Sequence, residues 1–405
     1  MNINPSAVYI SDYDYNLPSE QIAEHPLLER DSSRLLVYKD GTITDHIFKD
    51  LPEQIPAGAR LVVNNTRVIE ARLFFTKNTG AQIEIFCLSP HQPAEMTQSL
   101  MQPFNVQWNC LIGGASKWKP GQLLHKKVFI NDNELVLTAR YVGKSGEQFI
   151  IDFSWTSNHA FAEVLHAAGA IPLPPYIKRR AVDVDAERYQ TVFAQHQGSV
   201  AAPTAALHFT ENVFRRLSAK GINTSKVTLH VGAGTFKPVK SETIADHSMH
   251  AENFSVSAGT LAELIQSETI VAVGTTSLRT LESLHWLGVK LKKGNADLTL
   301  GQWEALTLAD DDITYKESLQ VLLDYLNQNN QDQLICNTSL IILPGYTFKS
   351  AQALVTNFHQ PRSTLLLLVA AFIGDDWKKV YQHALNNHYR FLSYGDSSLL
   401  WKKSS

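Results

Sequence analysis

The segment VAVGTTSLRTLES, residues 271–283, has the residue types of an anion-binding site. An apolar strand is expected to end just before Thr275 and Thr276, which offer hydroxyl groups and free backbone N–H groups at the start of a helix. Arg279 falls in the expected first turn, where a cation opposes the helix dipole by about 0.3–1 kcal/mol. The motif leaves two interpretations open: a bound carboxylate or phosphate, or a surface arginine paired with an acid such as Glu282.

Several histidines fall where expected strands and loops end, so they could move protons. His208 closes the small-residue loop SVAAPTAALHFT and precedes a helix cap, and His230 faces away from the apolar side of its strand. His359 and Asn357 lie in the proline-broken turn TNFHQPRST between two apolar segments. A packed, hydrogen-bonded ring is the more frequent role for any single histidine, because most histidines are not catalytic.

The residue spacings contain no metal-binding pattern. Asp246, His247 and His250 lie close together, but the two histidines are three positions apart and no HExxH sequence is present. The three cysteines are far apart and form no CxxC pair, which argues against a zinc knuckle and a disulfide framework. We therefore expect no metal.

The segment TLHVGAGTF, residues 228–236, resembles a strand that runs into a glycine-rich turn. Gly232 and Gly234 fit a dinucleotide fingerprint, but Lys237 stands where the third glycine is required. The chain has no lysine-containing phosphate loop here either. We interpret the turn as a strand-end loop whose small residues leave room for a ligand.

A basic stretch with aromatic neighbours, YIKRRAVDVDAERYQTVF, has the composition of an RNA contact. Lys178, Arg179 and Arg180 stand near Tyr176 and Tyr189, which suits backbone contacts and base stacking. A solvated charged loop explains the same composition equally well.

The bulk composition describes a globular chain without a global nucleic-acid signature. The chain has 405 residues, 44% hydrophobic residues and a formal charge of −3, so any RNA contact must use a local basic patch. The N-terminus lacks a basic start followed by an apolar run, and the longest apolar run, LLLLVAAFI, is far shorter than the about 20 residues of a membrane span. We expect a soluble, cytoplasmic protein that binds no membrane.

The candidate residues need a scaffold, and the hydrophobic pattern predicts an α/β protein with a second, all-β part. Residues 66–154 read as short alternating strands with short turns, which favours a small β-barrel. Strands then alternate with helices over 155–405, which predicts a mostly parallel sheet with helices on both faces. We expect the barrel to be an insertion into a domain made of residues 1–65 and 155–405, with a polar surface excursion at 288–340.

Many of these segments together resemble one family, the S-adenosylmethionine:tRNA ribosyltransferase-isomerases of queuosine biosynthesis. The resemblance runs through nearly the whole chain, in YDYNLPSEQIAEHPLLERDSSRLLV, LVVNNTRVIEARL, VAAPTAALHFT, VTLHVGAGTFKPV, DHSMHAE, VGTTSLRTLES, LVTNFHQPRSTLLLLVAAF and YRFLSYGDSSLL. Ala206 departs from the family pattern, which usually has glycine there, and the 288–340 segment is longer than usual.

The resemblance implies a layered α/β/α domain with an inserted β-barrel, and a reaction that needs no metal. The ribosyl part of S-adenosylmethionine, a co-substrate, passes to the aminomethyl-deazaguanine base at the wobble position of tRNA. The product is epoxyqueuosine, and adenine and methionine leave. We expect a monomer whose partners are S-adenosylmethionine and the precursor-bearing tRNA.

On this basis we assign site residues. The acid/base pool is His208, His230, Asp246, His250 and His359. The S-adenosylmethionine site is assigned to Thr204, Gly232, Gly234, Thr235, Thr275, Thr276, Arg279 and Asn357, with Thr275, Thr276 and Arg279 holding the methionine carboxylate. The tRNA site is assigned to Asn65, Arg67, Lys178, Arg179 and Arg180.

Two other classes of protein stay open. Another S-adenosylmethionine-dependent RNA-modifying enzyme, such as a methyltransferase, would release S-adenosylhomocysteine instead of adenine. A non-catalytic RNA-binding protein would not bind S-adenosylmethionine.

Overall fold

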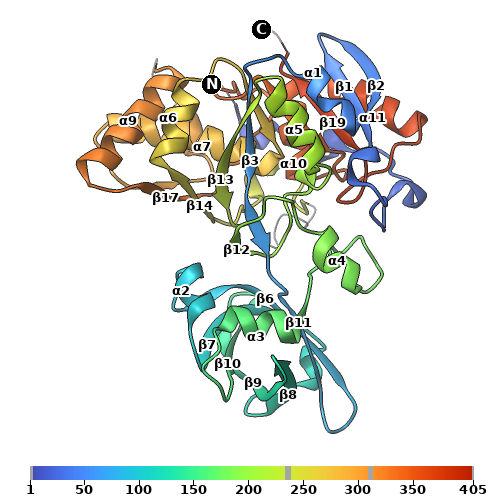
Figure 1. Ribbon diagram of the computed structural model, residues 1–405, viewed down its shortest axis with the longest axis vertical. Coiled ribbons are helices and arrows are strands. Elements are labelled where there is room, and N and C mark those ends of the chain that lie inside the picture. The colour runs from blue at the N-terminus through green and yellow to red at the C-terminus, as the bar shows by residue number, and fades with distance from the viewer. Residues whose placement is uncertain (1–2, 233–238, 309–312, 404–405) are drawn as a thin grey trace.

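The structure, a computed structural model, is a mixed α/β protein built around two large sheets. It describes residues 3–232, 239–308 and 313–403. Figure 1 shows a larger unit around a ten-stranded sheet and, below it, a smaller unit in which a seven-stranded sheet curls round. In the described part of the chain, no helix is long and apolar enough to cross a membrane.

The ten-stranded sheet is mixed, whereas the sequence predicts a mostly parallel one. Its strands, in spatial order, are β16 (Thr299–Leu300), β17 (Gln333–Thr338), β14 (Glu252–Ser257), β13 (Asn223–Leu229), β3 (Arg60–Asn64), β15 (Ile270–Val273), β18 (Ala353–Asn357), β19 (Ser397–Trp401), β1 (Arg34–Lys39) and β2 (Thr42–Ile47). Only the central strands β13, β3, β15 and β18 form a continuous parallel set. Antiparallel pairs flank this set: β14 runs antiparallel to β13 on one side, and β19 runs antiparallel to β18 on the other.

Helices pack on both faces of this sheet, because its strands alternate side chains between two buried surfaces. Val62 faces one core with α7 (Thr275–Lys292), while Leu61 and Val63 face the other with α5 (Glu211–Ala219). The first core also takes residues of α6 (Ala258–Ile265), α9 (Tyr315–Gln328), α10 (Thr364–Ile373) and α11 (Asp376–Asn386), and the second takes a residue of α1 (Leu51–Gln54). The helices α4 (Asp183–Arg188) and α8 (Glu304–Thr307) are short.

Residues 288–340 are not the polar surface excursion that the sequence predicts. Helix α9 buries Leu319, Leu322 and Leu326 in the larger core, and β17 is a strand of the ten-stranded sheet. These leucines recur at three- and four-residue spacing, so a polar average composition conceals one apolar helix face. Residues 309–312, which include three consecutive aspartates, lie outside the described residues.

The smaller unit is a curled antiparallel sheet with one helix at its core. Its strands, in spatial order, are β11 (Gly169–Ala170), β5 (Arg72–Thr76), β6 (Gln82–Gln92), β7 (Asn105–Gly113), β10 (Gln148–Ser154), β9 (Asn133–Ser145) and β8 (Leu123–Ile130). Within the described residues β11 and β8 do not pair with each other, so hydrogen bonding does not close the sheet into a full barrel. Helix α3 (Phe161–Ala168) packs Phe161 against Trp108 and Phe153, and α2 (Met96–Met101) adds Met96 to the same core. We propose that this unit extends to about residue 170.

Two paired strands join the units. Strand β4 (Thr66–Val68) leads the chain downward from β3, and β12 (His196–Ser199) runs parallel to it. Figure 1 shows β12 at the waist between the units. Gly198 has φ +133°, and an added Cβ would come within 2.5 Å of Met96 and 2.9 Å of His230. Only glycine fits where the two units meet this closely.

Candidate functional site

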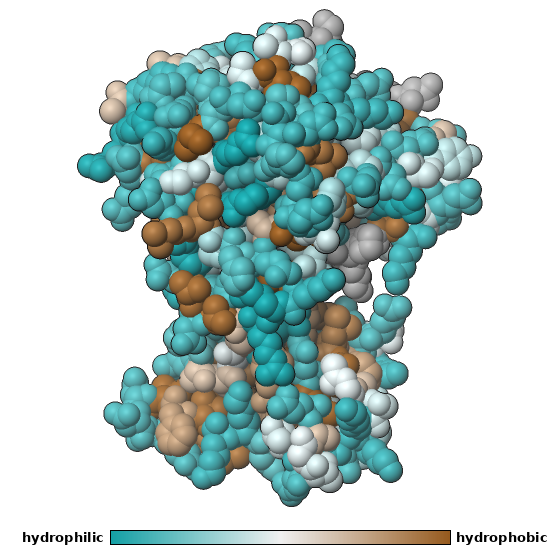
Figure 2. Space-filling model, turned by 90° about the vertical axis from the view of Figure 1, so that its right-hand side faces the viewer, coloured by the Kyte–Doolittle hydropathy of each residue, from teal (hydrophilic) through white to brown (hydrophobic). Residues whose placement is uncertain are grey.

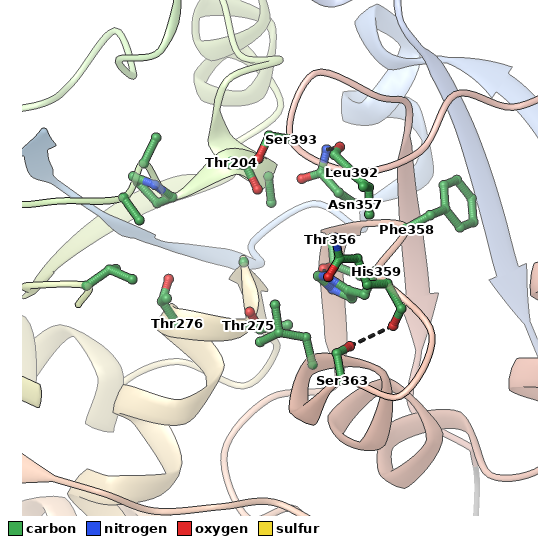
Figure 3. Close-up of a pocket in the computed structure, with 18 of the residues that line it drawn as sticks. Thr204, Thr275, Thr276, Thr356, Asn357, Phe358, His359, Ser363, Leu392 and Ser393 are labelled. Carbon is green, nitrogen blue, oxygen red and sulfur yellow. Dashed lines mark hydrogen bonds between the residues drawn. The ribbon is translucent and has the colours of Figure 1, made fainter. Parts of the chain in front are cut away.

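A pocket opens beyond the carboxyl ends of the parallel strands β15 and β18. About 710 Å³ of space, part of it open to solvent, lies there. Its walls come from three segments: Gly274–Thr276 after β15, Thr356–Gln360 at the end of β18, and residues 201–205 around the short helix η7 (Thr204–Ala206). Figure 3 shows Thr204, Thr275, Thr276, Asn357 and His359 around the same space. Five of the predicted site residues therefore line one pocket.

The strand–helix junction predicted to bind an anion forms one wall of this pocket. Strand β15 ends at Val273, Gly274 turns the chain with φ +91°, and α7 begins at Thr275. No side chain of the described residues caps α7, so within this part of the chain its first N–H groups are left for a ligand or solvent. Thr276 Oγ1 is buried and has no hydrogen-bond partner in the described chain. These are the features of a helix start that binds an anion.

Arg279 fits neither interpretation of the sequence in full. It is buried, and it forms an ion pair with Glu252 at the start of β14 instead of a surface pair with Glu282. Burial lowers the pKa of Arg279 to about 10, which still leaves it charged at neutral pH. It also lies in the second turn of α7, with Thr275 and Thr276 beside it in a smaller adjoining cavity of about 380 Å³.

Glu252, which the sequence analysis does not single out, connects Arg279 to the glycine-rich loop. Its Oε1 accepts a hydrogen bond of 2.9 Å from the backbone N–H of Gly232, while Oε2 faces Arg279. The signal available in the sequence is an acid directly after the DHSMHA segment, at the start of a strand. Gly234 and Thr235, also predicted for this loop, lie outside the described residues.

His208 lies behind the pocket wall and holds Asn357. Asn357 Nδ2 donates to the carbonyl of Leu392 at 3.2 Å, which fixes the amide orientation, and the same nitrogen is 3.2 Å from His208 Nε2. His208 Nε2 is then an acceptor, so Nδ1 carries the proton and donates to Ser33 Oγ at 2.8 Å. Burial lowers the pKa of His208 to about 3. Both ring nitrogens are occupied, while Asn357 Oδ1 has no partner among the described residues.

His359 is the member of the predicted acid/base pool that lines the pocket itself. Its Nε2 is 2.8 Å from Thr356 Oγ1, and Tyr15 donates a hydrogen bond to its backbone carbonyl. Burial lowers the pKa of His359 to about 3, so its ring is neutral at physiological pH. A neutral imidazole in an enclosed pocket has a lone pair with which to take a proton.

The other members of the pool lie elsewhere. His230 follows β13 at the junction of the two units, 3.4 Å from Thr66 Oγ1, and burial lowers its pKa to about 4. Asp246 ends the short helix η9 (Ile244–Asp246) and is exposed, as is His250. Neither His230 nor these two residues are among the groups that line the pocket.

The residues predicted to contact tRNA differ in exposure. Asn65 is buried and accepts a hydrogen bond of 2.7 Å from Thr228 Oγ1, and Arg179 donates to both oxygens of the buried Asp185 at 2.6 and 2.8 Å. These two side chains are used inside the fold. Arg67 is exposed on β4, and Lys178 and Arg180 are exposed beside α4. Among the described residues, no three histidine, cysteine or acidic side chains are grouped to hold a metal ion.

Comparison with known proteins finds similarity over nearly the full length of the chain. A family model described as queuosine biosynthesis protein matches residues 10–400. A protein of Azoarcus sp. (strain BH72) named S-adenosylmethionine:tRNA ribosyltransferase-isomerase is 40% identical over 396 residues, covering 96% of this chain and 97% of the relative. A protein of the same name from Ruegeria pomeroyi is 38% identical over 405 residues, covering 96% and 99%. A crystal structure of S-adenosylmethionine tRNA ribosyltransferase from Thermotoga maritima is 29% identical, with a TM-score of 0.46 and coverage of 96% and 99%.

Proposed function

The chain belongs to the family of queuosine biosynthesis proteins, and we propose that the pocket beyond β15 and β18 is where it acts as an S-adenosylmethionine:tRNA ribosyltransferase-isomerase. The ribosyl part of S-adenosylmethionine is transferred to the aminomethyl-deazaguanine base at the tRNA wobble position and isomerised there. Epoxyqueuosine forms, and adenine and methionine leave. This placement is supported by one pocket in which three features meet: the start of α7, the neutral ring of His359 and the amide of Asn357. Within the described residues, the start of α7 has no side-chain cap and Asn357 Oδ1 has no partner.

The start of α7 holds the methionine carboxylate in this proposal. The N–H groups before the first complete turn and the Thr276 hydroxyl point a partial positive charge at an anion. Arg279 lies in the adjoining cavity, where Glu252 offsets its charge, and its Nε–H group has no partner among the described residues and can donate to the ligand. Its ion pair with Glu252 keeps the guanidinium in place when no co-substrate is bound.

His359 is the base in this proposal. The sulfonium of S-adenosylmethionine acidifies the adjacent ribose methylene, and His359 removes a proton from that carbon. The electron pair left on that carbon forms a double bond to the next ribose carbon while the ring carbon–oxygen bond breaks, and the freed oxygen forms a carbonyl group as adenine leaves. The aminomethyl nitrogen of the tRNA base then attacks this product, and closure of the epoxide ring breaks the carbon–sulfur bond, so that methionine leaves with the electron pair. The acidity conferred by the sulfonium is what lets a weak, unprotonated base act here.

Asn357 orients a substrate N–H group in this proposal. Its Oδ1 faces no protein donor among the described residues, and its amide plane is fixed by Leu392 and His208. The adenine amine and the attacking aminomethyl group are both N–H donors that need such an acceptor. His208 is therefore a positioning residue, which acts through Asn357 and not on the substrate.

The same proposal covers the architecture and the partners. The larger unit is a layered α/β/α domain and the smaller one an inserted barrel-like domain, with tRNA contacting the exposed Arg67, Lys178 and Arg180 near the waist. The enzyme works as a cytoplasmic monomer without a metal.

Product analysis tests this proposal directly. Purified protein, S-adenosylmethionine and precursor-bearing tRNA are incubated, and nucleosides and small molecules are separated by liquid chromatography and mass spectrometry. We expect epoxyqueuosine in the tRNA and equal amounts of adenine and methionine. Release of S-adenosylhomocysteine with a methylated tRNA would instead identify a methyltransferase.

A further inference from the structure

A second cavity, lined by three arginines, lies directly behind the pocket. It comprises about 290 Å³ of space, part of it open to solvent, and Arg30, Arg188 and Arg390 form part of its wall. They come from the N-terminal segment, from the end of α4 and from the segment after α11. No acidic residue lines this cavity in the described part of the chain. In a chain of net charge −3, this is a marked local concentration of positive charge.

Two of the three guanidinium groups are held without being neutralised. Arg30 donates to three backbone carbonyl groups within residues 187–207, and Arg188 donates to those of Leu27 and Leu28. Backbone carbonyls carry no net charge, so these bonds fix the groups in position and leave their charge intact. Arg188 Nε is buried and has no partner among the described residues.

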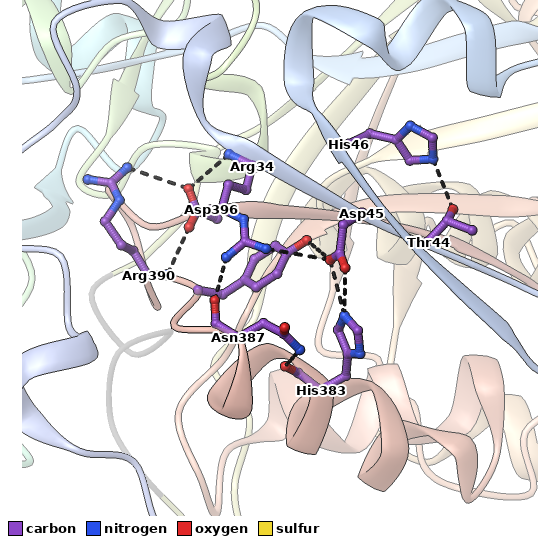
Figure 4. A network of polar contacts seen from close by, with 9 residues as sticks. Arg34, Thr44, Asp45, His46, His383, Asn387, Arg390 and Asp396 are labelled. Atoms are coloured by element: carbon purple, nitrogen blue, oxygen red, sulfur yellow. Dashed lines mark hydrogen bonds and ion pairs between the residues drawn. The ribbon is translucent and has the colours of Figure 1, made fainter.

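The third guanidinium has only a distant counter-charge. Arg390 Nη2 lies 3.7 Å from Asp396 Oδ1, and Asp396 also accepts backbone N–H groups of Arg34 and Arg390. Figure 4 shows Arg390 turned toward Asp396, with Arg34 on the other side of that carboxylate. Two carboxylates, that of Asp396, shared among several donors, and that of Glu187, whose charge acts on Arg30, are therefore set against three cations in the described part of the chain.

Bringing these cations together opposes folding unless an anion offsets the repulsion. Burial, and after it the charge of Arg188, lowers the pKa of Arg30, while the charge of Glu187 acts in the opposite direction. A fixed group of guanidiniums is well suited to a phosphate, whose oxygens accept paired N–H bonds.

The arginine cavity adjoins the reaction pocket. Ser393 lines both, and His208 lines the arginine cavity while its Nε2 faces Asn357 of the pocket. An occupant that spans both would carry a phosphate at one end and a reacting base at the other. A nucleotide of a single-stranded RNA loop, with its base turned out of the stack, has this form.

We propose that the arginine cavity binds a phosphodiester of the tRNA anticodon loop next to the base that is modified. The inference rests on the proposed function, which supplies the tRNA. Helix α4 carries Arg188 on the side of the molecule that Figure 2 presents, where the surface is largely hydrophilic and narrows between the two units.

Salt-dependent binding of precursor-bearing tRNA tests the proposal. Fluorescence anisotropy of labelled tRNA is measured between 50 and 200 mM salt for the wild type, R188Q, R390Q, R390K and the control R215Q. Arg215 is exposed on α5 and bonds only to Asn212 of the same helix in the described chain. We expect R188Q and R390Q each to weaken binding about tenfold and to lower the salt slope by about 0.7. R390K, which keeps the charge, should keep the slope, and R215Q should match the wild type.

Three outcomes would overturn the inference. One is an unchanged affinity and slope in R390Q, whose long contacts leave the fold least affected. Another is an equal change in R215Q, which would indicate a diffuse field instead of a site. The third is inorganic phosphate that stabilises the wild type without competing with tRNA at constant ionic strength, which would assign the cavity to free phosphate. S-adenosylmethionine affinity and wild-type turnover are measured in parallel. An inactive wild type refutes the proposed function. An active wild type, together with unchanged tRNA binding in R188Q and R390Q, refutes only this inference.

Discussion

Replacing Arg279 by methionine should separate its structural role from its proposed part in co-substrate binding. The side chains of Arg279 and Glu252 are 12% and 7% exposed, so R279M leaves a buried carboxylate without its counter-charge. Breaking a buried pair in this way costs about 3–5 kcal/mol of unfolding free energy. The same substitution at Arg140, which is 57% exposed and pairs with Asp152 on the smaller unit, should cost no more than about 1 kcal/mol.

The double variant R279M/E252Q removes both charges and keeps an acceptor for the Gly232 N–H group. Since a buried ion pair is often replaced at little net cost, we expect its stability to return to within about 2 kcal/mol of the wild type. Its affinity for S-adenosylmethionine should stay low. Loss of an ion contact worth up to about 2 kcal/mol raises Kd about 30-fold, while tRNA affinity stays near that of the wild type.

Urea unfolding and calorimetric titration with S-adenosylmethionine measure the two effects independently. If R279M is as stable as the wild type, the reasoning about a buried ion pair is wrong. If the folded double variant binds S-adenosylmethionine with unchanged affinity, Arg279 does not hold the methionine carboxylate. Reduced stability with restored affinity in the double variant would also refute the assignment, because it would show that only the fold depends on the pair.

Three further predictions concern the histidines and the metal. H359Q should slow turnover by about 10²-fold or more, with little change in S-adenosylmethionine affinity, and single-turnover assays would show this. If H359Q keeps full turnover, the base would instead be His230, Asp246 or His250. Burial holds the pKa values of His208 and His359 near 3 against about 6.5 when unfolded, so the unfolded chain binds more protons between these values. The contribution of these two histidines to the unfolding free energy should therefore be constant above pH 6.5 and fall by about 1.4 kcal/mol per pH unit per histidine below it. Urea titrations at pH 7 and 5 should show a smaller fall in unfolding free energy for H208Q than for the wild type. An equal fall in both proteins would contradict the burial argument. Treatment with EDTA should leave adenine release unchanged, and activity that is lost and then restored by one divalent metal would contradict this expectation.

The local sequence predicts the strand–helix elements well, because their signals lie within a few residues. Strand β15, the turn at Gly274 and helix α7 follow directly from an apolar run, a glycine and a helical repeat. The Thr210 cap of α5 is confirmed by its bond to the N–H of Val213. The mixed order of the sheet is not predictable in this way, since pairing between β14 and β17 joins segments about 80 residues apart and depends on contacts that no local pattern contains.

The site itself is predictable in its residue types but not in its pairings. Thr276, Asn357 and His359 are identified from strand-end loops and do meet in one pocket. Glu252 is missed because its partner Arg279 is 27 positions away, and the arginine cavity is missed because residues 30, 188 and 390 approach only in the fold. Arg179 shows the converse case, since a basic run that suits RNA binding contains one residue that holds the buried Asp185.

Burial explains how one pocket could receive a co-substrate that is itself a cation. Desolvation lowers the pKa of His359 to about 3 and that of Arg279 only to about 10, so at neutral pH the histidine has no charge and the arginine keeps its own. A protonated histidine beside the sulfonium would repel it, with an energy magnified by the low dielectric of the pocket. In the proposed arrangement the neutral ring avoids that repulsion, while Arg279, whose charge Glu252 offsets in part, acts at the opposite end of the co-substrate, on the carboxylate. The same loss of solvation therefore produces a base that tolerates the sulfonium and a cation that orients it.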